Sequence, residues 1–194
     1  MDYQEAKKDL LDVKFSPECE EYFIQNGYPL EYGYCKLLKG EFDSAKKIFY
    51  SVKDIDLRAD WAYLFIQFMN NYIQFMPSYL QIRNFLEVDI GLLIRAQMAE
   101  QVENVINASD IFYKINQESY KFIARAMLNY NYPTIAKIFL NKGVEKCYND
   151  PELHFLYGNY HLLYKNTLLA KSEFQNCLEI LPNYYPAVKM LKNL

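Results

Sequence analysis

Small residues recur at a fixed spacing near the C-terminus of the chain, and this recurrence limits the folds open to it. Gly158 and Ala170 stand 34 residues after Ala124 and Ala136. Phe174 lies one helical turn beyond Ala170. Small side chains let two helices approach closely while one aromatic ring fills the groove between them. The recurrence therefore predicts a helical hairpin that is repeated along the chain.

Residues that break helices lie between segments whose apolar residues recur with the spacing of a helix. The chain has only 6 Gly and 7 Pro among its 194 residues, too few for an all-β chain of many short strands. Ser16-Pro17-Glu18 combines a capping residue, a proline and an acid, which favour a first helical turn. Asp150-Pro151 opens another helix. We expect helices at residues 1–14, 30–39, 42–53, 151–164, 168–181 and 184–194.

The composition narrows the class of partner. The net charge is −3 and the sequence pI is about 5.5, which argues against binding nucleic acid through a general basic surface. The chain contains 19 Tyr and one Trp. Tyrosine buries a large ring and keeps a hydroxyl for water or a partner. Its abundance fits either a core rich in Tyr and Phe or a binding surface.

The chain carries no apparent targeting or membrane signal. Its N-terminal residues lack the basic start and apolar run of a secretion signal. The most apolar window, residues 61–76, is interrupted by polar amides and is too polar to span a bilayer. No C-x-x-C pair is present, so the pattern indicates reduced thiols in a cytoplasmic protein. The cysteines are Cys19, Cys35, Cys147 and Cys177.

The repeated small and aromatic residues resemble the signature of the tetratricopeptide repeat, a 34-residue helix–turn–helix unit. In the C-terminal part the resemblance rests on Tyr157, Gly158, Ala170, Phe174, Cys177 and Pro182. In the N-terminal part it rests on Gly33, Gly40, Phe42, Ala45 and Phe49. Two units between these parts depart more from the pattern. In the first of them the resemblance rests on Trp61 and Leu64, and in the second on Ala96, Ala108 and Phe112.

The resemblance implies an all-α fold, a right-handed α-solenoid of stacked antiparallel hairpins forming one domain over residues 1–194. Each hairpin cannot bury its apolar faces alone, so neighbours stack and the ends need caps. Capping helices would occupy residues 1–25 and residues 183–194, with about five hairpins over residues 26–182. The hairpins would begin near Asn26, Arg58, Asp89, Gln117 and Pro151.

No catalytic or metal-binding pattern stands out. His154 and His161 are seven residues apart on one predicted helix, or about 10 Å along its axis, too far to share a zinc ion. No P-loop and no G-x-G-x-x-G turn is present to hold a nucleotide. We therefore expect a protein that is not an enzyme and that has no cofactor and no metal.

The resemblance also implies which residues would line a concave peptide-binding groove. Lys121 and Arg125 are four residues apart and share a helix face, so they could hold a carboxylate of a partner. The alternative is that both are solvated surface charges. The other candidates for the groove are Phe155, Asn159 and Leu162, and, in an apolar N-terminal stretch, Tyr34, Ile66 and Met69.

These observations predict a cytoplasmic, non-enzymatic interaction module that binds a peptide or helix of another protein. A second hypothesis is a chaperone or assembly factor whose apolar groove shields a client segment. A third is a helical enzyme or ligand-binding protein with its site in residues 76–116. The expected partner is a protein or peptide rather than nucleic acid or a membrane, and the sequence is compatible with a homo-oligomer.

Overall fold

The computed structural model describes residues 1–14 and 16–194, and every regular segment in them is helical. The N-terminal helices are α1 (Tyr3–Leu11), α2 (Pro17–Gln25), α3 (Pro29–Leu38), α4 (Phe42–Val52), α5 (Leu57–Met69), α6 (Tyr79–Asn84), the π-helical segment η1 (Phe85–Asp89), α7 (Ile90–Arg95) and α8 (Ala99–Asn107). They are followed by α9 (Ser109–Ile115), α10 (Ser119–Asn129), α11 (Pro133–Lys146), α12 (Pro151–Leu163), α13 (Thr167–Ile180) and α14 (Tyr185–Lys192).

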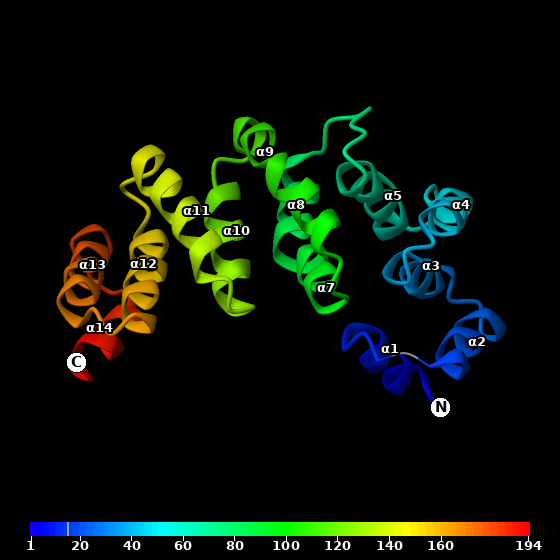
Figure 1. Cartoon of the computed structure of the whole chain (residues 1–194), viewed down its shortest axis with the longest axis horizontal. Helices are drawn as coiled ribbons and strands as arrows, with labels where there is room; N and C mark the ends of the chain where they lie inside the picture. Colours follow the sequence, from blue (N-terminus) through cyan, green and yellow to red (C-terminus); the bar gives the residue numbers. More distant parts are fainter. Residues whose placement is uncertain (15) are drawn as a thin grey trace. The chain divides into compact units, whose positions relative to one another are not determined.

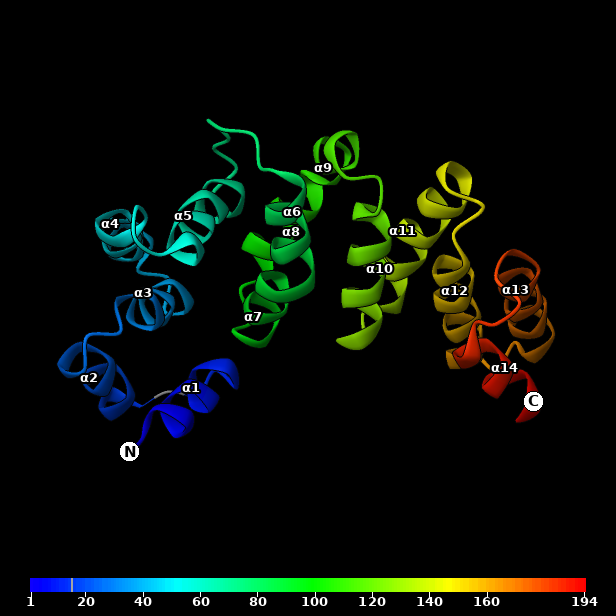
Figure 2. The same ribbon diagram turned by 180° about the vertical axis from the view of Figure 1, so that it is seen from behind.

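The chain divides into two compact units, Met1–Asp110 and Ile111–Leu194, with the boundary inside α9. In each unit most of the packing joins helices that follow one another in the sequence. The pairs α3–α4 and α12–α13 run side by side in both views (Figures 1 and 2). The all-helical class and the sequential packing of helix pairs agree with the prediction from the sequence.

A left-handed residue closes each of the three clearest hairpins. Gly40 has a φ of 80°, Asn131 of 63° and Lys165 of 58°. In each turn the next amide N–H donates to a carbonyl five residues back, at 2.9 Å for Glu41, 2.7 Å for Tyr132 and 3.0 Å for Asn166. This is the Schellman pattern, which satisfies the last carbonyls of a helix and reverses the chain.

Glycines lie where two helices touch, as the spacing predicts. A Cβ at Gly33 would lie 2.3 Å from a ring carbon of Phe49, and a Cβ at Gly158 would lie 2.4 Å from one of Phe174. Ala45 and Ala170, each four residues before its Phe, are fully buried, and so is Ala136. Ala136, Gly158 and Ala170 are all buried, which agrees with the close helix contacts expected from their small side chains.

The middle of the chain differs from the predicted repeat phase. No helix covers residues 70–78, although the third unit would need its second helix there. A helical segment then runs without a break from Tyr79 to Arg95 and passes through Asp89, where the fourth unit would begin. Its start is fixed by Ser78 and Gln81, which form a capping box. The segment continues through Gly91 and ends before Gln97, which has a left-handed φ of 58°.

Candidate functional site

Lys121 and Arg125, the pair expected to hold a carboxylate of a partner, instead bond carboxylates of the chain itself. The Nζ atom of Lys121 on α10 lies 2.7 Å from Asp150 and 2.8 Å from Glu118. The guanidinium of Arg125 bonds Glu152 on α12. Lys121 also lies 3.4 Å from Glu152. The network ties α10 to the start of α12, so these cations are not simply solvated.

Burial and charge act in opposite directions on Lys121, whose side chain is only 8% exposed. Desolvation favours the neutral amine, but hydrogen bonds to Asp150 and Glu118 outweigh it and hold the pKa of Lys121 above its ordinary value. Asp150 also caps α12 by accepting from the backbone N–H groups of Glu152 and Leu153. The arrangement is typical of a structural link between helices.

The other C-terminal groove candidates lie on α12 and are half-buried. The ring of Phe155 lies 5.7 Å from that of Phe174 and 5.5 Å from that of Tyr184. Leu162 packs against the core formed by Ala170, Phe174, Cys177 and Ala187. Asn159, which lies between Phe155 and Leu162 in the sequence, is also half-buried. Phe155 and Leu162 therefore serve the packing of α12, α13 and α14.

The N-terminal groove candidates lie inside the first unit. Ile66 and Met69 on α5 are 2% and 0% exposed. The hydroxyl of Tyr34 on α3 donates to Asp89 at 3.0 Å, and the amide of Asn84 donates to the other carboxyl oxygen at 2.7 Å. Burial raises the pKa of Asp89 to about 7, against these two hydrogen bonds. The three candidates thus pack in or beside the core of this unit.

A different set of residues forms an open site on α4 and α5. Lys46 and Tyr50 are four residues apart on α4, and Lys53 follows three residues later, directly after the helix. This spacing brings the three side chains to one face. Tyr63 on α5 meets them because α4 packs against α5. We call this set, with Lys47, the Lys–Tyr face.

Tyr50, Tyr63 and two of the lysines of this face, Lys46 and Lys53, lie close together. The rings of Tyr50 and Tyr63 have centroids 5.6 Å apart and are tilted by 52°. The Nζ atom of Lys53 lies 4.6 Å from the Tyr50 centroid and 5.9 Å from that of Tyr63. That of Lys46 lies 5.7 Å from the Tyr63 centroid. Each ammonium is thereby held near a ring face.

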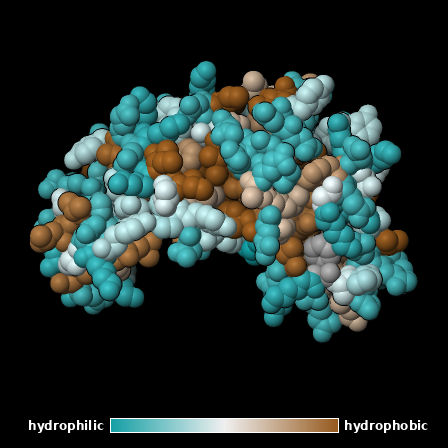
Figure 3. All heavy atoms as spheres, viewed as in Figure 1, coloured by the Kyte–Doolittle hydropathy of each residue, from teal (hydrophilic) through white to brown (hydrophobic). Residues whose placement is uncertain are grey.

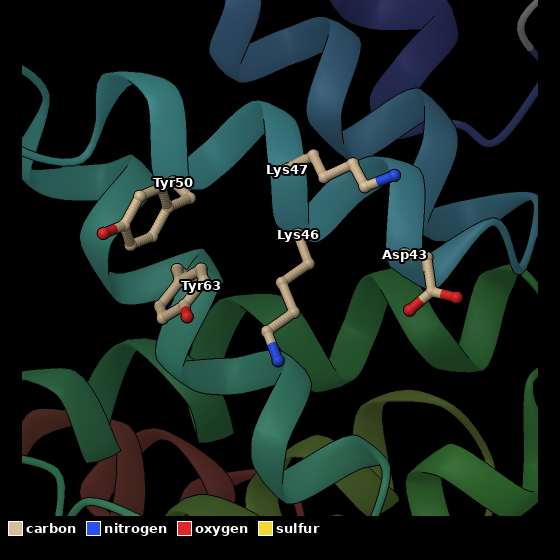
Figure 4. A pocket seen from close by; sticks show the side chains of 5 residues that line it. All are labelled: Asp43, Lys46, Lys47, Tyr50 and Tyr63. Carbon is tan, nitrogen blue, oxygen red and sulfur yellow. The ribbon is translucent and has the colours of Figure 1, made fainter.

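Four residues of the Lys–Tyr face, Lys46, Lys47, Tyr50 and Tyr63, line an open cavity of about 410 Å³ together with Asp43. Tyr50 and Tyr63 line one end, Asp43 and Lys47 lie farther along α4, and Lys46 extends between them (Figure 4). Tyr50 is 58% exposed. The cavity is open to solvent, so it can receive side chains of a partner from the surface.

The lysines of this face differ from Lys121 in one decisive respect. Within residues 1–14 and 16–194, Lys46, Lys47 and Lys53 form no ion pair with a carboxylate. Three cations and two accessible rings can together bind carboxylate groups and an apolar or aromatic side chain.

The histidines are part of the packing of the second unit. His154 is 1% exposed, with Nδ1 2.7 Å from Glu173 and Nε2 2.8 Å from the carbonyl of Tyr148. His161 stacks on Tyr157, with centroids 4.8 Å apart. Among the described residues no three His, Cys, Asp or Glu side chains are grouped to hold a metal ion. The four cysteines are free thiols.

The Lys–Tyr face was missed by sequence reasoning, although a signal for it exists. Lys46, Tyr50 and Lys53 have the i, i+4, i+7 spacing of one helix face. Tyr63 could not be added without knowing how α4 packs on α5. Asp89 was also missed. Its signal is a single charge within the apolar run Val88 to Ile94.

Comparisons with known proteins add no identification. No family model matches the chain, and neither a curated protein nor a solved structure matches it. Among the helices that the structure describes, none has the length and apolarity needed to cross a bilayer.

Proposed function

We propose that this protein is a non-enzymatic interaction protein whose Lys–Tyr face binds an acidic segment of a partner protein. The observation that carries the proposal is that three lysines of this face lack a carboxylate partner among the described residues. Lys46, Lys47 and Lys53 have no carboxylate partner in the described chain, whereas Lys121 is bonded to Asp150 and Glu118. Unpaired cations around an open cavity favour an anionic partner.

The lining of the cavity favours a peptide over nucleic acid. Asp43 is at the same cavity and can accept hydrogen bonds from the backbone N–H groups of a peptide, which nucleic acid lacks. Tyr50 and Tyr63 provide apolar surface for an aromatic or aliphatic side chain. The net charge of −3 also disfavours a polyanion with one charge per nucleotide. The expected ligand is a short segment with several Asp or Glu around one apolar residue.

The expected affinity is modest. An exposed ion pair contributes about 0.2–1 kcal/mol, so three lysines alone cannot give tight binding. Burial of one apolar side chain against Tyr50 and Tyr63 adds about 1.5–3 kcal/mol. The sum fits a reversible, salt-sensitive interaction.

The proposal includes a tetratricopeptide-like solenoid as the scaffold. Support comes from two triplets with the same spacing, Gly33, Ala45 and Phe49 in the first unit and Gly158, Ala170 and Phe174 in the second. In both, the Phe ring fills the space beside the glycine. A further support is the sequential pairing of the helices within each unit.

A selection from a random peptide library displayed on phage tests the proposal. The wild-type protein should enrich peptides rich in Asp and Glu around an apolar residue. The K46E/K47E/K53E variant should lose this preference, because its face repels carboxylates. Enrichment of the same acidic peptides by both proteins would show that another surface binds them.

A control variant should carry the same change in net charge elsewhere. Lys137, Lys189 and Lys192 are exposed on α11 and α14 of the second unit. K137E/K189E/K192E should select the same peptides as the wild type. If it instead behaves like the triple variant of the face, the preference reflects overall charge rather than a site.

A further inference from the structure

The segment that joins α5 to α6 exposes an unusual amount of apolar surface. Five large apolar side chains between residues 72 and 80 are 45–65% exposed: Tyr72, Phe75, Met76, Tyr79 and Leu80. Hydrophobic residues gather where this connection extends beyond the end of α5 (Figures 1 and 3). We call residues 72–80 the connector patch. Contiguous exposed apolar surface of this kind marks an interaction site.

The connector patch has a defined backbone despite its exposure. The N–H of Tyr72 donates to the carbonyl of Gln67 at 2.9 Å, and the N–H of Gln74 donates to the side-chain oxygen of Gln67 at 3.1 Å. Asn104 on α8 bonds the carbonyl of Met69 at 2.8 Å. Pro77 is buried. The exposed side chains are thus presented from an anchored segment, which lowers the entropic cost of binding.

The connector patch carries no charge. Between Asp60 and Arg83 the sequence has no Asp, Glu, Lys or Arg. A charged partner, such as the acidic segment proposed for the Lys–Tyr face, would find no opposite charge to pair with there. Two copies of the same patch meet without like-charge repulsion, and Tyr and Gln side chains can both donate and accept hydrogen bonds across a two-fold axis.

The backbone of the connector patch argues for a protein rather than a lipid surface. The N–H groups of Ile73, Phe75 and Met76 have no acceptor among the described residues. Hydrocarbon leaves such groups unsatisfied at a cost of several kcal/mol each. A second chain can offer carbonyl or amide oxygens to them.

The exposed area is sufficient for a weak dimer. Side chains of this size present roughly 200 Å² each, so the exposed parts of the five amount to about 600 Å² per copy. Two copies would bury about 1,200 Å², the lower end of specific interfaces. The apolar character, the aromatic content and the presence of Met are those of an interface core.

We propose that the connector patch is a self-association surface through which two copies of the chain form a two-fold symmetric dimer of micromolar affinity. The connector patch shares no residue with the Lys–Tyr face, so dimer formation and acidic-peptide binding can be tested with separate variants.

Sedimentation velocity of the full chain, from about 1 to about 200 µM, tests the proposal because a micromolar dimer dissociates within this range. The wild type should shift from monomer to dimer as concentration rises. F75D/M76D brings like charges together across the axis and should weaken association by about 100-fold or more. Its circular dichroism spectrum and its binding of acidic peptides should match the wild type.

Two further samples make the result specific. Leu168 and Leu169 on α13 are 84% and 52% exposed, so L168D/L169D is a matched control that should still dimerise. F75K/M76K should be monomeric alone but should form a heterodimer when mixed with F75D/M76D, because Phe75 and Met76 lie at the centre of the connector patch and would face their own copies near a two-fold axis. A wild type that stays monomeric at about 200 µM, or an F75D/M76D variant that still dimerises, overturns the proposal.

Discussion

The ring of Phe174 fills the space that a side chain at position 158 would occupy. A Cβ on Gly158 would lie 2.4 Å from Cε1 of Phe174, which is itself fully buried. Gly158→Ala should therefore lower the free energy of unfolding by about 1–2 kcal/mol, because overpacking costs more than the helix propensity gained. Urea denaturation of the full chain measures the change. In a Phe174→Leu background the same substitution should be nearly neutral.

Ala170 occupies the corresponding position on the facing helix. It is 0% exposed and packs in one cluster with Phe174, Cys177 and Ala187. Ala170→Leu should cost roughly 1–3 kcal/mol, since the larger side chain forces α12 and α13 apart. Leu168→Ala is the control, because Leu168 is 84% exposed and its truncation removes little packing. Equal melting temperatures for Ala170→Leu and the wild type would contradict the close helix contact.

These two hairpin contacts could be foreseen because they depend on local spacing. Gly158, Ala170 and Phe174 fix how α12 meets α13 through residues at most 16 positions apart. The Tyr79–Arg95 segment could not be placed, because its start depends on a capping box at Ser78 and Gln81 rather than on the repeat period. A prediction that assumes a constant repeat length cannot place an additional non-helical connection such as residues 70–78.

The candidate site was less accessible to sequence reasoning. Lys121 was expected to face a partner, but Asp150 and Glu152 lie 29 and 31 residues later in the sequence and bond it across α10 and α12. Such pairs depend on the register between helices, which helical spacing does not reveal. The same limit applies to Tyr50 and Tyr63 of the Lys–Tyr face.

Asp89 should make the stability of the first unit depend on pH. Its carboxyl is 2% exposed, and burial raises its pKa from 3.8 to about 7. The folded state therefore binds the proton more tightly than the unfolded state, and stability should fall as pH rises from about 4 towards 7. Asp89→Asn keeps the shape and stays neutral, so it should be more stable relative to wild type at pH 8 than at pH 5. Chemical denaturation at both values measures this, and an unchanged difference would refute the buried acid.

The two histidines should titrate in different pH ranges. Burial opposes the charge of His154, but the hydrogen bond to Glu173 outweighs it and raises the pKa of His154 above its ordinary value. Burial lowers the pKa of His161. The stabilisation from the charged His154 is complete below its unfolded pKa of about 6.5 and is lost as pH rises through the raised value. An NMR titration should give two separate midpoints.

Substitution of Glu173 checks the assignment of those midpoints. Glu173→Gln removes the carboxylate that lies 2.7 Å from Nδ1 of His154. The higher midpoint should move down, because a neutral amide stabilises the imidazolium less. His154→Gln should remove that midpoint altogether and leave the lower one. Two midpoints that coincide in the wild type would contradict the ion pair.

The affinity of one selected acidic peptide for three proteins tests the central claim most directly. Calorimetric titration should give weak binding, of the order of tens of micromolar to millimolar, to the wild type and to K137E/K189E/K192E, and this binding should weaken as salt rises because exposed pairs are screened. Binding to K46E/K47E/K53E should fall at least about tenfold, the effect of losing three ion pairs of about 0.5 kcal/mol each. Equal affinity for all three proteins would contradict the assignment of acidic-segment binding to the Lys–Tyr face.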